Sequence, residues 1–287
     1  MLPVVAIVGR PNVGKSTIFN ALTRTRDALV ADMPGVTRDR QYGISDVGER
    51  ACVLVDTGGL VAGAEGIDYL TAQQVHQAIE ESQLVFFVVS ARDGLTHEDQ
   101  EIARLLREHN RPVLLVGNKI DGTNPDISLA EFAALGMGPA LPAAASHRQG
   151  MSSLMEEADA LLPPEEEGEA DSEEERDRLR LAIVGRPNVG KSTLVNRMLG
   201  EERVMAFDLP GTTRDTISVF MEHGGIKYEL IDTAGVRRRA RVTDMVEKFS
   251  VIKALQAIER AHVVVLMLDA TEGITDQDTT LLGHILN

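Results

Sequence analysis

The sequence predicts an α/β fold with two doubly wound, mostly parallel sheets, one in each half of the chain. Short apolar runs alternate with stretches of helical periodicity, a pattern typical of parallel strands covered by helices on both faces. The second half also repeats the first, because three short motifs return at a constant offset of 176 residues. Motifs that recur at one offset indicate a duplicated domain.

The chain has 287 residues, enough for two domains with separate cores. We expect a first domain over residues 1–162, an acidic flexible linker over 163–178 and a second domain over 179–287. The linker segment holds nine acidic and two basic residues. Charge repulsion should therefore keep it extended, as a solvated spacer rather than a binding tail.

The composition is that of a soluble globular protein, with 43% hydrophobic and 25% charged residues. No apolar run approaches the ~20 residues of a membrane span, and the N-terminus shows no signal peptide, so we expect a cytoplasmic protein. The net charge of −15 argues against a general nucleic-acid binder. The single cysteine, Cys52, is expected to be a small buried hydrophobe, and the seven histidines show no zinc-site spacing.

The most informative motif reads Gly-Arg-Pro-Asn-Val-Gly-Lys-Ser and occurs twice, at 9–16 and 185–192. It matches the P-loop pattern, in which backbone N–H groups and a lysine surround phosphates and a hydroxyl binds Mg²⁺. A strand-like run precedes each copy and a helical stretch follows it. This order is typical of a P-loop and is not expected of an ordinary glycine turn. We predict that both loops bind nucleotide phosphates, through Gly9, Arg10, Pro11, Asn12, Val13, Gly14, Lys15, Ser16 and Thr17, and through Gly185, Arg186, Pro187, Asn188, Val189, Gly190, Lys191, Ser192 and Thr193.

Two further motifs follow each P-loop. A Pro-Gly loop at 34–39, repeated at 210–215, carries a hydroxyl that could reach the metal. An apolar strand then ends in an Asp that can hold Mg²⁺ through water and a glycine that can turn its N–H to the γ-phosphate. The predicted metal ligands are Ser16, Thr37, Asp56, Ser192, Thr213 and Asp232. The predicted nucleotide contacts of the Asp-x-x-Gly segments are Asp56, Thr57, Gly58, Gly59 and Leu60, and Asp232, Thr233, Ala234, Gly235 and Val236.

The base is predicted from a later strand of the first domain. Strands are expected at 84–89, 113–116 and 140–143, and helices at 67–82, 98–109 and 151–162. The second of these strands runs into Asn-Lys-x-Asp, whose carboxylate can accept both hydrogen bonds from guanine, whereas adenine would leave it unpaired. The predicted base contacts are Asn118, Lys119, Ile120 and Asp121, together with the backbone N–H of Ala145. We therefore expect two P-loop NTPase domains of the Ras-like G type in tandem, binding GTP or GDP.

The second domain is expected to be incomplete. Its strand at 263–268 matches 84–89 at an offset of 179, so its own Asn-Lys-x-Asp would fall near position 297. A basic run follows its Asp-x-x-Gly motif and is either a solvated loop or a contact to phosphate or RNA. The residues of this basic run are Arg237, Arg238, Arg239 and Arg241.

Taken together, these motifs resemble the Der (EngA) family of tandem GTPases. The resemblance covers the whole chain and rests on the tandem order, the two identical P-loops and the acidic linker. It implies GTP hydrolysis in assembly of the large ribosomal subunit, and a KH-like domain after the second G domain. Ala144 stands where such proteins usually have Ser, a change of small expected effect because this loop acts through its backbone.

The resemblance also bears on hydrolysis. Ras-like GTPases place a water-orienting Gln where this chain has Leu60 and Val236. Similarity to potassium-activated GTPases implies that Asn12 and Asn188 help to bind K⁺, which would offset charge in the transition state. The predicted catalytic residues are Asn12, Lys15, Thr37, Gly59, Asn188, Lys191, Thr213 and Gly235. Two other classes stay open: a nucleotide-gated module that binds RNA or protein with little turnover, and a tRNA-modification GTPase, for which no extra catalytic domain is evident.

Overall fold

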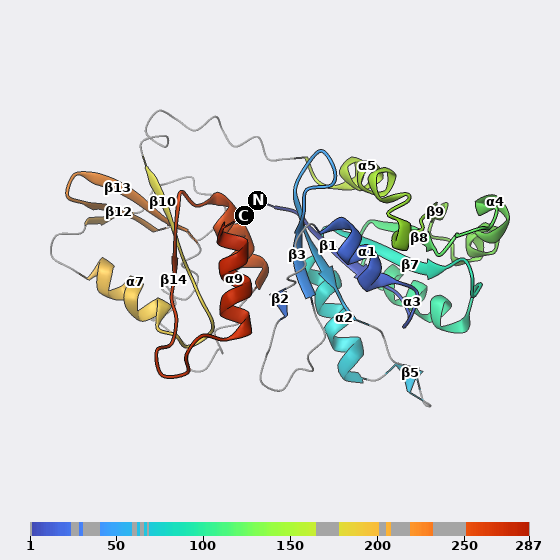
Figure 1. The fold of residues 1–287 in the computed structure, drawn as a ribbon, viewed down its shortest axis with the longest axis horizontal. Helices are drawn as coiled ribbons and strands as arrows, with labels where there is room; N and C mark the ends of the chain where they lie inside the picture. The colour runs from blue at the N-terminus through green and yellow to red at the C-terminus, as the bar shows by residue number, and fades with distance from the viewer. Residues whose placement is uncertain are drawn as a thin grey trace. The chain divides into compact units, whose positions relative to one another are not determined.

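The computed structural model describes residues 2–23, 29–30, 41–58, 62–63, 66–67, 69–164, 178–200, 205–207, 219–231 and 251–286. The chain divides into two compact units, Met1–Pro164 and Glu165–Asn287 (Figure 1), and each is considered by itself. In the part of the chain so described, no helix combines the length and apolar character needed to cross a bilayer.

The first unit is built on one seven-stranded sheet of order β2-β3-β4-β1-β7-β8-β9. The strands from β4 to β9 are parallel, and β2 and β3 add an antiparallel edge. A separate two-stranded pair is formed by β5 and β6. The strand bounds are β1 (Val4–Val8), β2 (Leu29–Val30), β3 (Gln41–Ser45), β4 (Cys52–Asp56), β5 (Ala62–Gly63), β6 (Gly66–Ile67), β7 (Leu84–Ser90), β8 (Val113–Asn118) and β9 (Leu141–Pro142).

Helices connect the parallel strands, as right-handed crossovers require. Their bounds are α1 (Lys15–Leu22), α2 (Tyr69–Glu81), α3 (His97–Glu108), α4 (Pro125–Ser128) and α5 (Met151–Leu161), with 3₁₀ turns η1 (Ala130–Leu135) and η2 (Ala145–His147). Every residue of β1, β4 and β7 is buried, because these strands have side chains packed on both faces.

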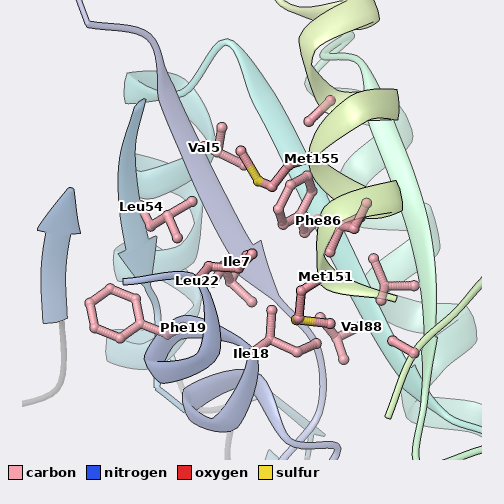
Figure 2. Close-up of a cluster of buried hydrophobic side chains, with 14 of the residues drawn as sticks. Val5, Ile7, Ile18, Phe19, Leu22, Leu54, Phe86, Val88, Met151 and Met155 are labelled. Carbon is pink, nitrogen blue, oxygen red and sulfur yellow. The ribbon is translucent and has the colours of Figure 1, made fainter. Parts of the chain in front are cut away.

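The core of the first unit lies between the sheet and the helices α1 and α5. Figure 2 shows side chains of alternating strand positions, such as Val5 and Ile7 of β1, directed toward Phe19 of α1 and Met155 of α5. All four of these side chains are completely buried. This packing holds the start of α1, and with it the end of the preceding loop, against the carboxyl end of β1.

The sheet of the second unit, of order β11-β12-β13-β10-β14, repeats the part of the first sheet from β2 to β7. Here β10 pairs in parallel with β13 and β14, as β1 does with β4 and β7. Among the described residues the sheet ends at β14, whose first residue, Val263, is 43% exposed. The bounds are β10 (Leu179–Val184), β11 (Met205–Phe207), β12 (Val219–His223), β13 (Ile226–Ile231), β14 (Val263–Leu266), α7 (Lys191–Leu199), α8 (Val251–Arg260) and α9 (Asp276–Leu286).

The predicted α/β class is confirmed, with a mostly parallel sheet in the first unit, whereas the described sheet of the second unit has two parallel and two antiparallel pairs. One short strand was not predicted, since Leu29–Val30 pairs with β3 in antiparallel orientation. The helix expected from Ile67 begins at Tyr69, because Gly66–Ile67 pairs with β5 instead. Both strands are two residues long, too short to produce a periodic signal in the sequence.

Candidate nucleotide-binding site

The first phosphate loop connects β1 to α1 through backbone conformations that its sequence permits. Gly14, at the N-cap of α1, is left-handed with φ of 98° and makes no side-chain cap. Asn12 also has positive φ, 63°, a conformation that Asn tolerates better than most residues. A Cβ on Gly14 would lie 2.3 Å from the Asn118 amide nitrogen, so only glycine fits. The helix N-terminus is thus left open to an anion.

The loop lysine is buried and held by the backbone of its own loop. Lys15 is 4% exposed, and its Nζ donates to the carbonyl oxygen of Arg10 at 2.9 Å. Burial lowers the pKa of Lys15 to about 8, while the nearby Asp56 carboxylate opposes this shift and Arg10 adds to it. A buried cation in a loop of this shape is suited to receive phosphate oxygens, which would restore its charge.

The second loop repeats these conformations. Gly190 and Asn188 have φ of 99° and 64°, and Lys191 Nζ donates to the Arg186 carbonyl at 2.6 Å. Both copies of the motif therefore fold as the same structure, although the residues around them differ.

Two of the residues predicted to bind Mg²⁺ in the first unit, Ser16 and Asp56, lie together. Ser16 Oγ donates to Asp56 Oδ2 at 2.6 Å, although the two residues are 40 positions apart. Asp56 is 2% exposed, and its other oxygen accepts from the backbone N–H of Gly58 at 3.1 Å. A hydroxyl beside a carboxylate is a hard oxygen pair that fits Mg²⁺ bound through one or two protein groups. Thr57 instead fixes the strand end, since its Oγ1 donates to the Ile7 carbonyl at 2.8 Å.

Asn118 connects the phosphate loop with the predicted base loops. Its Nδ2 donates to the Val13 carbonyl at 2.9 Å, and its Oδ1 accepts from the backbone N–H of Ala145 at 3.1 Å. The side chain is almost fully buried. Lys119 Nζ donates to the Asn12 carbonyl, a second link to the phosphate loop. Three segments far apart in the sequence are thus joined at one place.

The predicted base reader lies at the edge of this junction. Asp121 follows β8, and one of its carboxylate oxygens lies 3.2 Å from Nε2 of His147. The carboxylate is 42% exposed, so it is accessible from solvent. The backbone N–H of Ile120 donates to the Ala143 carbonyl at 3.3 Å, which keeps this loop beside Ala145. Nothing in the sequence around position 147 predicted this contact of His147.

The side chain of the loop arginine makes contacts that were not predicted from the sequence. Arg10 NH2 donates to Asp93 Oδ2 at 3.0 Å, and its Nε lies 3.5 Å from Asp99 Oδ2. The repeated Thr-x-x-Asp at 96–99 and 275–278 was the available signal for this contact.

Several predicted residues lie outside the described part of the chain, so their roles stay predictions. In the first unit these are Thr37, Gly59 and Leu60. In the second unit they are Thr213, Asp232, Thr233, Ala234, Gly235, Val236 and the arginines at 237, 238, 239 and 241.

Comparison with known proteins agrees with this geometry. A family model described as "50S ribosome-binding GTPase" matches residues 4–119 and 180–287, one segment in each unit. The chain belongs to the 50S ribosome-binding GTPase family. GTPase Der of Thioalkalivibrio sulfidiphilus is 59% identical over 287 residues, and GTPase Der of Methylococcus capsulatus is 58% identical over 286 residues. The predicted resemblance to Der GTPases is thereby confirmed.

These alignments cover the chain and its relatives unequally. Each covers 100% of this chain but only 62% and 61% of the two relatives. The chain therefore spans less than two thirds of the length of the Der proteins it matches.

Proposed function

We propose that the first unit binds GTP and GDP with Mg²⁺ and hydrolyses GTP, and that this cycle serves assembly of the large ribosomal subunit. The observation that carries the proposal is Asn118, whose buried amide joins the phosphate loop to the backbone of Ala145. Phosphate-binding and base-reading groups then belong to a single site. The family's description as ribosome-binding supports the choice of partner.

Ser16 and Asp56 would hold the Mg²⁺, Ser16 directly and Asp56 through water. The ion would supply charge neutralisation across the β- and γ-phosphates during transfer. Lys15 would contribute a second positive charge from within the loop. Each of these groups is already placed by a hydrogen bond within the protein.

Guanine selection is assigned to Asp121. Replacing Asp121 by Asn would turn one acceptor into a donor, so the site should prefer xanthosine triphosphate to GTP. Competition between the two nucleotides for the first site measures this preference, in a chain that carries Lys191→Ala to disable the second site. Unchanged preference for GTP would assign base recognition to another group.

We further propose that K⁺ stimulates hydrolysis through Asn12. The left-handed backbone at Asn12 offers a competing reason for an asparagine here. Asn12→Gly distinguishes a role in binding K⁺ from a purely conformational role, because glycine keeps the left-handed backbone and removes only the side-chain amide. Phosphate release should be faster in K⁺ than in Na⁺ at equal ionic strength, and Asn12→Gly should abolish the difference. Equal rates of phosphate release in both salts for the unmutated chain would rule out stimulation of hydrolysis by K⁺.

The deciding experiment is titration with GDP and Mg²⁺ that counts the bound sites, with ATP as the competitor. One or two sites selective for guanine would support the proposal, and absence of binding would overturn it. GTP binding with no measurable phosphate release would favour the nucleotide-gated module instead. Co-sedimentation with large ribosomal subunits in GTP and in GDP tests the partner.

A further inference from the structure

The arginine of the first phosphate loop is tied by its side chain to the segment between β7 and α3. Arg10 is 12% exposed and contacts two carboxylates, those of Asp93 at 3.0 Å and Asp99 at 3.5 Å. Asp93 lies in the turn after β7, and Asp99 is the third residue of α3. The same arginine supplies the carbonyl oxygen that accepts from Lys15 Nζ. One residue therefore connects the phosphate-binding lysine with the start of α3.

Asp99 also belongs to a capping box, which by itself does not explain its burial. Its Oδ2 accepts from the backbone N–H and the hydroxyl of Thr96, at 3.0 and 2.8 Å. Asp99 is completely buried, and a buried carboxylate is costly unless a cation offsets its charge. The Arg10 guanidinium is placed to do so.

The second unit contains a similar arrangement, but its arginine hydrogen-bonds to the buried carboxylate, whereas Arg10 Nε forms only an ion pair with Asp99. Arg186 NH1 donates to Glu272 at 2.8 Å, and its Nε donates to Asp278 Oδ1 at 3.1 Å. Asp278 is 1% exposed and caps α9 together with Thr275. The outer carboxylate differs between the units, Asp93 in one and Glu272 in the other. The buried Asp and its Thr are retained although neighbouring positions have changed.

We propose that Asp99 and Asp278 are positioning residues for the two phosphate loops. Each buried carboxylate fixes the guanidinium of the loop arginine, and the carbonyl of that arginine in turn holds the lysine that receives the phosphates. The inference rests on the proposed binding of guanine nucleotide, and it adds a residue outside the loop to the groups on which that binding depends.

A double-mutant cycle tests the route through the arginine. GDP release with Mg²⁺ is measured in the full chain carrying Lys191→Ala, so that only the first site reports. Asp99→Asn and Arg10→Gln should each speed release about tenfold, and the double variant should release GDP no faster than the faster single variant. Effects that multiply would show that Asp99 does not act through Arg10, and would overturn the proposal.

Two further variants separate positioning from general loss of stability. Thr96→Ala removes the capping partner but keeps the buried carboxylate, so it should lower the unfolding midpoint and leave GDP release within about twofold. Arg10→Lys keeps the positive charge but lacks the planar guanidinium that can contact two carboxylates. It should therefore release GDP at a rate between those of the unmutated chain and Arg10→Gln. Release from Thr96→Ala as fast as from Asp99→Asn would assign the effect to the cap.

The remaining outcomes are also decisive. If Asp99→Asn does not fold, GDP release by Arg10→Gln at the rate of the unmutated chain still overturns the proposal. A rate of GDP release that rises from Arg to Lys to Gln at position 10 still supports it. Failure of the proposed function has a different signature, because the unmutated first site would then retain no GDP. If this inference alone fails, the unmutated first site still binds GDP and releases it slowly, and the variants show unchanged release, effects that multiply, or fast release from Thr96→Ala.

Discussion

At the scale of single residues, identical motif glycines have different surroundings in the two units. A Cβ on Gly14 would lie 2.3 Å from the Asn118 amide, whereas the nearest atom to a Cβ on Gly190 is Met267 Cε at 3.8 Å. Both glycines have φ near 98°, so alanine carries a similar backbone cost at either position. Only the first substitution also displaces the amide that joins the loops.

We therefore predict unequal effects of the same substitution. Gly14→Ala should abolish GDP binding in the first site. Gly190→Ala should weaken any binding in the second site by about tenfold, which corresponds to the ~1–2 kcal/mol cost of a left-handed backbone. Each variant is titrated in a chain whose other loop lysine is replaced by Ala. Equal losses at the two sites would contradict the role given to Asn118.

Cys52 provides a prediction with a pH dependence. Burial raises the pKa of its thiol from 9.0 to about 12, with the Asp159 carboxylate adding to the shift and Arg50 opposing it. Because the thiolate is the reactive form, the native protein should resist alkylation by iodoacetamide up to pH 9 and beyond. In denaturant the thiol should react with an ordinary midpoint near pH 9. Rapid labelling of the native chain at pH 8 would contradict the burial of β4.

At the scale of elements, β7 is a fully buried interior strand between β1 and β8. Phe86 of β7 is completely buried within the cluster shared with α1 and α5 (Figure 2). Phe86→Ala should lower the free energy of unfolding of the first unit by about 3–5 kcal/mol, through lost contacts and the cavity left behind. Urea unfolding measures this, and the transition of the first unit is the one that GDP shifts to higher urea.

The matched control lies on a short helix of the same unit. Ile127 of α4 is 76% exposed, so Ile127→Ala should change stability by less than about 0.5 kcal/mol. Similar losses for both substitutions would mean that stability does not follow the packing of the sheet.

At the scale of the whole molecule, the chain consists of two compact units, and the first contains all the described groups of the proposed guanine site. A separate chain of residues 1–164 should therefore fold and bind GDP with an affinity within a few-fold of the first site in the full chain. Calorimetry on both proteins makes the comparison. Loss of binding in the shorter chain would show that the second unit completes the site.

Much of the first unit could be predicted because its signals are local. The continuous apolar runs of β1, β4, β7 and β8 indicated buried strands, and the loop motifs lay at their carboxyl ends. The two-residue strands and the three-residue turn η2 had no comparable signal, because two or three residues do not produce a period. The contacts of Arg10 and His147 were missed because their partners lie on other segments of the chain. Only the Arg10 contact had a sequence signal, the repeated Thr-x-x-Asp at 96–99 and 275–278.

The sequence by itself determined the duplicated α/β architecture, the two phosphate loops and the residues proposed to select guanine, because each depends on a pattern within one segment. Only the tertiary structure decided how these segments meet. Asn118 joins the phosphate loop to Ala145 across a long stretch of sequence, and Asp99 is buried against Arg10 of the same loop. Such contacts depend on the order of strands in the sheet, which brings the carboxyl ends of β1, β4, β7 and β8 to one edge.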